Sequence, residues 1–136
     1  MIYVPPFTWW FDTGCSIHIT NTLQGFTNLK ERKNEVYNVF VGNGSKVAVE
    51  SVGSVSFKLS SGFILFLSPI LYVPSMRRNL ISASKLVKSG YTFIRDNESV
   101  RLFHSNKLDI FLGYALLHID MWQLQCNYLH ECFTVC

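Results

Sequence analysis

Short apolar stretches separated by small turn residues limit this chain to a fold made mainly of strands. Residues 54–59 and 63–67 are two such stretches, and Ser60-Ser61-Gly62 joins them. Runs of this kind around a glycine-containing turn predict a β-hairpin. The pattern repeats along most of the sequence, and a 15% share of aromatic residues, with 11 Phe, also favours strands. An all-β domain is therefore the first expectation.

Further strands are predicted over residues 8–11, 17–20, 36–41, 47–52, 70–73, 91–94, 100–104 and 110–117. In the run 17–20, alternation places Ile17 and Ile19 on one face and His18 and Thr20 on the other. Residues 24–34 are polar, which predicts a surface loop or a short helix. The segment 42–46 is rich in Gly and Asn and lies between two β-branched runs, which predicts the tip of a mobile hairpin.

One short helix is predicted near residues 83–89. Ser82 can cap its N-terminus, Lys85 and Lys88 suit its last turns, and Gly90 can end it. Leu86 should then pack on the sheet.

The length, composition and net charge of the chain narrow the classes of protein to which it can belong. The chain has 136 residues, 49% hydrophobic and 15% charged, which suits one packed domain. The net charge is +3, but basic and acidic residues are interleaved, so no nucleic-acid partner is predicted. The apolar run 63–67 is too short to span a bilayer, and Pro69 follows it. Without a secretory signal at the start, we expect a cytoplasmic protein.

Four cysteines do not form the spread framework of a secreted disulfide scaffold, so free thiols are expected. Cys126, His130, Cys132 and Cys136 are zinc-ligand types gathered near the end of the sequence. Their spacing matches no common zinc finger or knuckle. Two interpretations remain, a metal site and an irregular chain end. The role of these four residues is left open.

The segment Asp12-Thr13-Gly14 carries the clearest chemical signal. An apolar run ending at Phe11 predicts a buried strand that delivers Asp12 to a loop. There Thr13 can hydrogen-bond locally, and Gly14 can take backbone angles that a Cβ would forbid. A catalytic carboxylate can be presented in this way, although an ordinary turn has the same composition.

Four blocks in order extend this signal. They are WFDTGCSIHIT at 10–20, VGNGSKV at 41–47, LYVP at 71–74 and NLISASKL at 79–86, with Gly90-Tyr91 after the last. Together they resemble the protease region of copia-type retrotransposon Pol polyproteins, over about residues 9–94. The stretch 113–124 is similar to the short β segment that follows in these polyproteins. The resemblance thus implies one domain over residues 1–124 and a divergent tail over 125–136.

The resemblance implies an aspartic endopeptidase of the retropepsin type. Its fold would be a small closed or partly open β-barrel, and its active form a homodimer in which each chain brings one loop. Asp12 would be catalytic, the Thr13 hydroxyl would brace the two loops, and Gly14 would let the backbones approach. The substrate would be an extended segment of its own polyprotein, in the cytoplasm or in virus-like particles, without a membrane. No metal or cofactor is implied.

Two further segments take roles from the resemblance. The residues that match the substrate-binding flap are Gly42, Asn43, Gly44, Ser45 and Lys46. Residues 79–82 stand where retropepsins have an apolar-apolar-Gly turn behind the catalytic loop.

Several titratable residues outside the motif are further candidates. Asp96, Asp109 and Asp120 are predicted to be surface or turn residues rather than partners of Asp12. His18 is interpreted as a strand histidine bonded to a backbone acceptor, or as a proton shuttle. Cys15 replaces the alanine usual in these elements and puts an oxidisable thiol beside the loop.

Two functions from different classes therefore remain. The first is a dimeric aspartic endopeptidase that cuts the polyprotein. The second is a non-catalytic β-barrel remnant with a peptide-binding or structural role.

Overall fold

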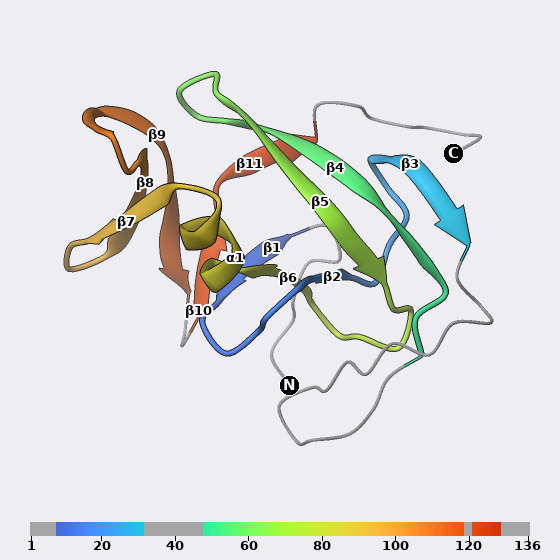
Figure 1. Ribbon diagram of the computed structural model, residues 1–136. Helices are drawn as coiled ribbons and strands as arrows, with labels where there is room; N and C mark the ends of the chain where they lie inside the picture. The colour runs from blue at the N-terminus through green and yellow to red at the C-terminus, as the bar shows by residue number, and fades with distance from the viewer. Residues whose placement is uncertain (1–7, 32–47, 119–120, 129–136) are drawn as a thin grey trace.

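A computed structural model of the chain describes residues 8–31, 48–118 and 121–128 (Figure 1). Strands dominate this part of the chain, with one short helix. The elements are β1 (Trp9–Asp12), β2 (His18–Thr20), β3 (Phe26–Glu31), β4 (Ser51–Leu59), β5 (Ile64–Tyr72), β6 (Asn79–Ser82), α1 (Ala83–Lys88), β7 (Tyr91–Arg95), β8 (Ser99–His104), β9 (Lys107–His118), β10 (Met121–Leu124) and β11 (Cys126–Tyr128). The expected β class with one helix is confirmed.

The strands form one sheet in the order β11-β4-β5-β2-β6-β1-β10-β9-β8-β7, with β3 also paired to β4. Among the described strands this order has two ends, so the sheet is open. Two pairs are parallel, β1 with β6 and β2 with β5, and the others are antiparallel. Figure 1 shows β7, β8 and β9 on one side of the molecule and the long β4–β5 hairpin on the other, with β1, β6, β10 and α1 between them.

The main core is mostly aliphatic, and aromatic rings within it join distant parts of the chain. The Trp9 and Phe57 rings meet edge to face at 4.9 Å between centroids, and Tyr128 packs on Phe57 at 5.5 Å. The Trp9 indole N–H donates to the Tyr128 hydroxyl at 2.9 Å. A second, smaller cluster contains Ile19 and Val73 beside other aliphatic residues. Both faces of strand β1 are therefore almost fully buried in the protein interior.

The predicted β4–β5 hairpin is confirmed, with Gly62 in its turn at φ +91°. The two runs predicted at 63–67 and 70–73 belong to one continuous strand, β5. The predicted helix is also confirmed. Ser82 caps α1 by accepting a hydrogen bond from the Lys85 N–H at 3.2 Å, and Leu86 is buried. Gly90 follows the helix with φ +95°.

The prediction of a loop or helix over residues 24–34 is wrong for residues 26–31, which form β3, whereas residues 24 and 25 lie in a turn. This strand pairs with β4 and is mostly exposed, so its sequence lacks the apolar alternation of a half-buried strand. Asn28 has a positive φ of 54°, where the register shifts between Thr27 and Lys30. Such an irregularity breaks the period of two on which a strand prediction depends.

Two other predictions need comment. His18, Ile19 and Thr20 are all buried rather than alternating, because β2 lies between β5 and β6. The strand predicted over 47–52 begins at Ser51 as β4. The strand predicted over 36–41 and the flap segment Gly42 to Lys46 lie outside the described residues. The described part of the chain contains no helix of the length and apolarity needed to cross a membrane.

Candidate functional site

The Asp12 loop begins where β1 leaves the core. Trp9, Trp10 and Phe11 are buried, whereas Asp12 is half-buried and both Thr13 and Gly14 are exposed. The apolar run therefore forms a buried strand that ends at the half-buried Asp12, as the sequence predicted.

The carboxylate is held by its own loop. Asp12 Oδ1 accepts a hydrogen bond from the Gly14 N–H at 2.7 Å. Gly14 is not in the left-handed region, so it does not use the backbone freedom that a glycine offers at this position. A Cβ at Gly14 would lie 3.4 Å from Asp12 Oδ1, an ordinary contact. Within one chain, glycine is therefore not required here by the backbone conformation.

Residues of β6 and the start of α1 hold the Asp12 loop in place through hydrogen bonds. Ser82 is the parallel register partner of Asp12 and is fully buried. Its hydroxyl donates to the Cys15 carbonyl at 2.6 Å, and its backbone N–H donates to His18 Nδ1 at 3.0 Å. The segment expected as a turn behind the loop is thus a strand followed by a capped helix, and Ser82 connects it to both ends of the loop.

At the other end of β6, Asn79 performs a similar task. Its side chain is 1% exposed. Asn79 Oδ1 accepts from the Thr20 hydroxyl at 2.7 Å and from the Asn21 N–H at 3.0 Å, while its amide nitrogen donates to the Thr8 carbonyl at 3.0 Å. One buried amide therefore ties together β1, β2 and β6. Sequence reasoning missed this role, although a polar residue at the start of an apolar strand is a signal for it.

His18 differs from the interpretation of a ring that donates to a backbone acceptor. Because Ser82 contributes an N–H, His18 Nδ1 must be the acceptor and the ring is neutral, with its proton on Nε2. Burial lowers the pKa of His18 to about 4, and the positive charge of Lys85 acts in the same direction. The ring positions Ser82 at neutral pH.

Cys15 is less reactive than its place beside the loop suggested. Its thiol donates to the Ile17 carbonyl at 2.7 Å. Burial is the main cause that raises its pKa, and the Asp12 charge adds to this. Since the thiolate is the reactive form, the environment disfavours oxidation.

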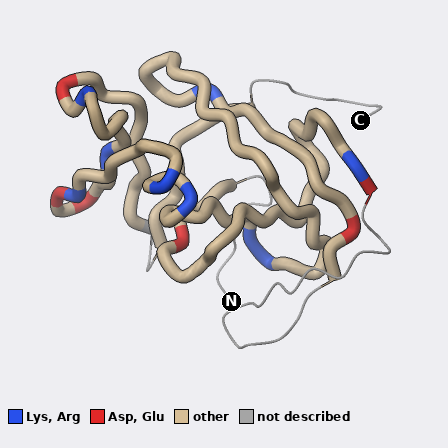
Figure 2. The backbone as a smooth tube through the Cα atoms, in the orientation of Figure 1, with Lys and Arg blue, Asp and Glu red and all other residues tan. Residues whose placement is uncertain are grey.

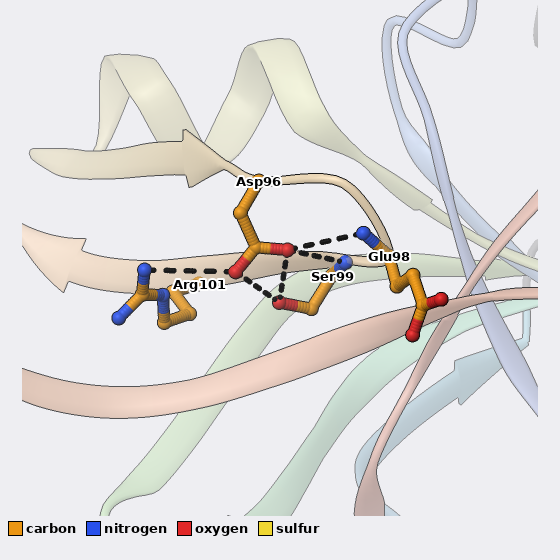
Figure 3. Close-up of polar contacts among 4 residues, drawn as sticks. All are labelled: Asp96, Glu98, Ser99 and Arg101. Carbon is orange, nitrogen blue, oxygen red and sulfur yellow. Dashed lines mark hydrogen bonds and ion pairs between the residues drawn. The ribbon is translucent and has the colours of Figure 1, made fainter.

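Asp96 and Asp109 do not take part in this site. Asp96 accepts hydrogen bonds from the N–H groups of Glu98 and Ser99 and from the Ser99 hydroxyl, and it lies 3.6 Å from an Arg101 nitrogen (Figure 3). These donors lower the pKa of Asp96 and fix the turn between β7 and β8. Asp109 is exposed on β9. Both agree with the surface role predicted for them, whereas Asp120 lies outside the described residues.

Metal ligands do not gather in the described part of the chain: no group of three or more His, Cys, Asp or Glu residues is placed to hold an ion there. Cys126 is mostly buried on β11, which raises its pKa to about 12. His130, Cys132 and Cys136 lie outside the described residues, so the zinc interpretation of the tail stays a prediction.

Comparison with known proteins decides the origin of this domain. Residues 9–91 match the family model described as the Pol polyprotein, beta-barrel domain. The chain belongs to this family. The matched residues begin at β1 and end at the first residue of β7, so they include the Asp12 loop together with β6 and α1, which support it.

A curated relative agrees with this origin. The Retrovirus-related Pol polyprotein from transposon TNT 1-94 of Nicotiana tabacum is 31% identical over 98 residues, which cover 72% of this chain. The chain spans 7% of the length of that relative. No solved structure matches. The expected relation to Pol polyproteins of copia-type retrotransposons is therefore confirmed.

Proposed function

We propose that this domain is an aspartic-type endopeptidase that processes its polyprotein as a homodimer, with one Asp12 from each chain. The observation that carries the proposal is the placement of Asp12. It stands at the end of a buried strand, on a loop whose next two residues are exposed, and it is braced by two elements of the same chain.

The chemistry requires two carboxylates. Hydrolysis of a peptide bond needs a base to activate water and an acid to protonate the departing nitrogen. Two carboxylates a few ångströms apart can share one proton and provide both functions, as they do in aspartic proteases generally. Since the chain contains a single Asp-Thr-Gly, one copy alone has only half of this machinery. A monomer should be inactive.

The neighbouring residues take roles that suit a dimer. Thr13 is exposed next to Asp12, where its hydroxyl would reach the partner loop. Gly14 has no conformational requirement within one chain, so close approach of the partner backbone is the remaining reason for a residue without a side chain. The segment Gly42 to Lys46 would close over an extended substrate, which would add a strand between the flap and the floor of the site.

The test combines oligomeric state with cleavage. Sedimentation velocity at micromolar concentration should show a dimer, and incubation with peptides spanning the junctions of its polyprotein at mildly acidic pH should give defined products. Asp12→Asn should lower kcat/KM by about 10³-fold or more while leaving the dimer intact, because it removes the ionisable group alone. Asp109→Asn, an exposed aspartate on β9, is the matched control and should retain full activity.

Two results would contradict the proposal. A chain that stays monomeric and cuts none of the peptides would favour the non-catalytic remnant, with a peptide-binding or structural role. Cleavage that persists in Asp12→Asn would show that another group or a contaminating protease performs the hydrolysis.

A further inference from the structure

A cavity of about 270 Å³ lies beside α1, and the Asp12 loop does not line it. Its walls come from β2, β5, α1 and β7, which supply His18, Phe66, Ser68, Lys85, Lys88 and Tyr91 among others. A cavity of this size holds a small organic molecule rather than a single water. Nothing in the proposed peptidase mechanism uses it.

The charges around the cavity have one sign. Lys85 and Lys88 are three residues apart on α1 and therefore lie on the same face of the helix. No Asp or Glu is among the residues that line the cavity. Figure 2 shows that α1 carries basic residues and no acidic one. The described residues supply no carboxylate within ion-pair distance of either ammonium group.

The uncharged polar groups of the wall are also hydrogen-bond donors. His18 uses Nδ1 to accept from Ser82, so the proton on its other ring nitrogen remains to be donated. The Ser54 hydroxyl donates to the Ser68 hydroxyl at 2.8 Å, which leaves the Ser68 proton for another acceptor. Two ammonium groups, an imidazole N–H and a hydroxyl together favour a ligand that accepts hydrogen bonds and carries negative charge.

The remaining wall is aromatic and aliphatic. Phe66 is 55% exposed although it is a large apolar side chain, and Tyr91 on β7 is half-buried. Leu67 and Leu86 complete the apolar part of the wall. An organic body beside these rings would remove apolar surface from water.

We propose that this cavity binds a small organic anion, in which a carboxylate or phosphate contacts Lys85 and Lys88 and an apolar or aromatic body covers Phe66 and Tyr91. The site is independent of the peptidase proposal, because it shares no residue with Asp12-Thr13-Gly14. One wall residue, His18, also accepts the hydrogen bond from the Ser82 N–H behind the Asp12 loop.

The test uses three probes that share a phenyl ring and differ in the group attached to it. Phenyl phosphate carries a ring and a phosphate, 3-phenylpropanoate carries a ring and a carboxylate, and phenol carries the ring alone. In NMR titrations, the two anions should produce saturable shifts in the ring resonances of His18, Phe66 and Tyr91 at millimolar concentration. Phenol should bind more weakly than both. The order of the two anions then tells a phosphate ligand from a carboxylate ligand.

Removing the charges of Lys85 and Lys88 distinguishes binding at this cavity from general attraction of an anion to a basic protein. The double variant Lys85→Met, Lys88→Met should weaken the tighter anion by about tenfold or more, since Met keeps the helix propensity while both charges are lost. The double variant Lys58→Met, Lys107→Met removes two exposed charges elsewhere and should bind the anion as the unmodified protein does. The Asp12→Asn variant should also bind normally.

A second readout does not depend on the variants. Because the Lys85 charge helps to lower the pKa of His18, a bound anion that offsets this charge should raise that pKa above its free value of about 4. The proposal is overturned if no probe gives saturable shifts, if phenol binds as tightly as the anions, or if the Lys85, Lys88 double variant binds unchanged.

Discussion

Two regions of this domain are built on different principles. The loop-support region, made of β1, β2, β6 and the start of α1, contains the buried polar residues His18, Thr20, Asn79 and Ser82. The meander of β7, β8 and β9 has no buried polar side chain among its described residues. It instead exposes large apolar ones, namely Ile94, Leu108, Ile110, Phe111, Leu116 and Leu117.

This difference shows which region requires one arrangement of its side chains and which region can accept several. A buried polar group is costly unless its own partner is in place, so the loop-support region is stable in only one geometry. The meander is held by antiparallel pairing and by buried apolar residues such as Leu102, which can be exchanged for others of similar size. A loop that must present Asp12 at a fixed position benefits from the first kind of support.

The sharpest test of this contrast is Asn79→Leu. Leucine has a similar volume but leaves the Thr20 hydroxyl, the Asn21 N–H and the Thr8 carbonyl without the bonds that Asn79 makes to them. We expect the free energy of unfolding, measured with urea, to fall by about 3 to 4 kcal/mol. Asn106→Leu in the exposed turn of the meander should cost less than about 0.5 kcal/mol. Equal costs for the two variants would remove the contrast.

Acid should weaken the loop-support region through His18. The pKa of this histidine is about 4 in the folded chain, whereas an unburied histidine has a pKa of 6.5. As pH falls from 6.5 to about 4, the unfolded chain binds a proton that the folded chain does not. The His18 contribution to the free energy of unfolding should therefore decrease by about 3 kcal/mol over that window and stay level below it. Urea unfolding across this range should lose that component in His18→Gln, and an unchanged slope would contradict the prediction.

The smallest effect is expected on the exposed face of the meander. Ile110→Thr and Leu117→Thr alter side chains that are 47% and 45% exposed, and threonine suits a strand. Each should change the free energy of unfolding by less than about 0.5 kcal/mol. Leu102→Ala, at 1% exposure, should cost about 3 kcal/mol in the same thermal or urea assay. A loss above about 1 kcal/mol in either threonine variant would show that this face is covered in solution.

The sequence predicted the local features well for a physical reason. The β4–β5 hairpin and α1 are each specified by neighbouring residues: a Gly-containing turn in one case, and the Ser82 cap with Gly90 in the other. The position of Asp12 at the end of a buried strand follows from the same kind of signal. Strand β3 escaped prediction because its exposed, irregular backbone carries no apolar alternation.

The support of the site could not be predicted in this way. The bond between Thr20 and Asn79 joins residues 59 positions apart, and that between His18 and Ser82 spans 64. No local pattern reports such a contact, and the parallel pairing of β1 with β6 is equally non-local. The loop was predicted from its own residues, while the buried groups that hold it were found only in the folded chain.

The parallel pairing of β1 with β6 also sets an order of events during synthesis. Translation produces Asp12 before the strand and helix that brace its loop, which end at Lys88, about seventy-six positions later, counted from the bounds of β1 and α1. A nascent chain emerges at roughly 5–20 residues per second, so several seconds separate the two. Throughout that interval the ribosome carries a chain whose loop has no scaffold, and the arrangement around Asp12 is completed only after most of the domain has left the exit tunnel.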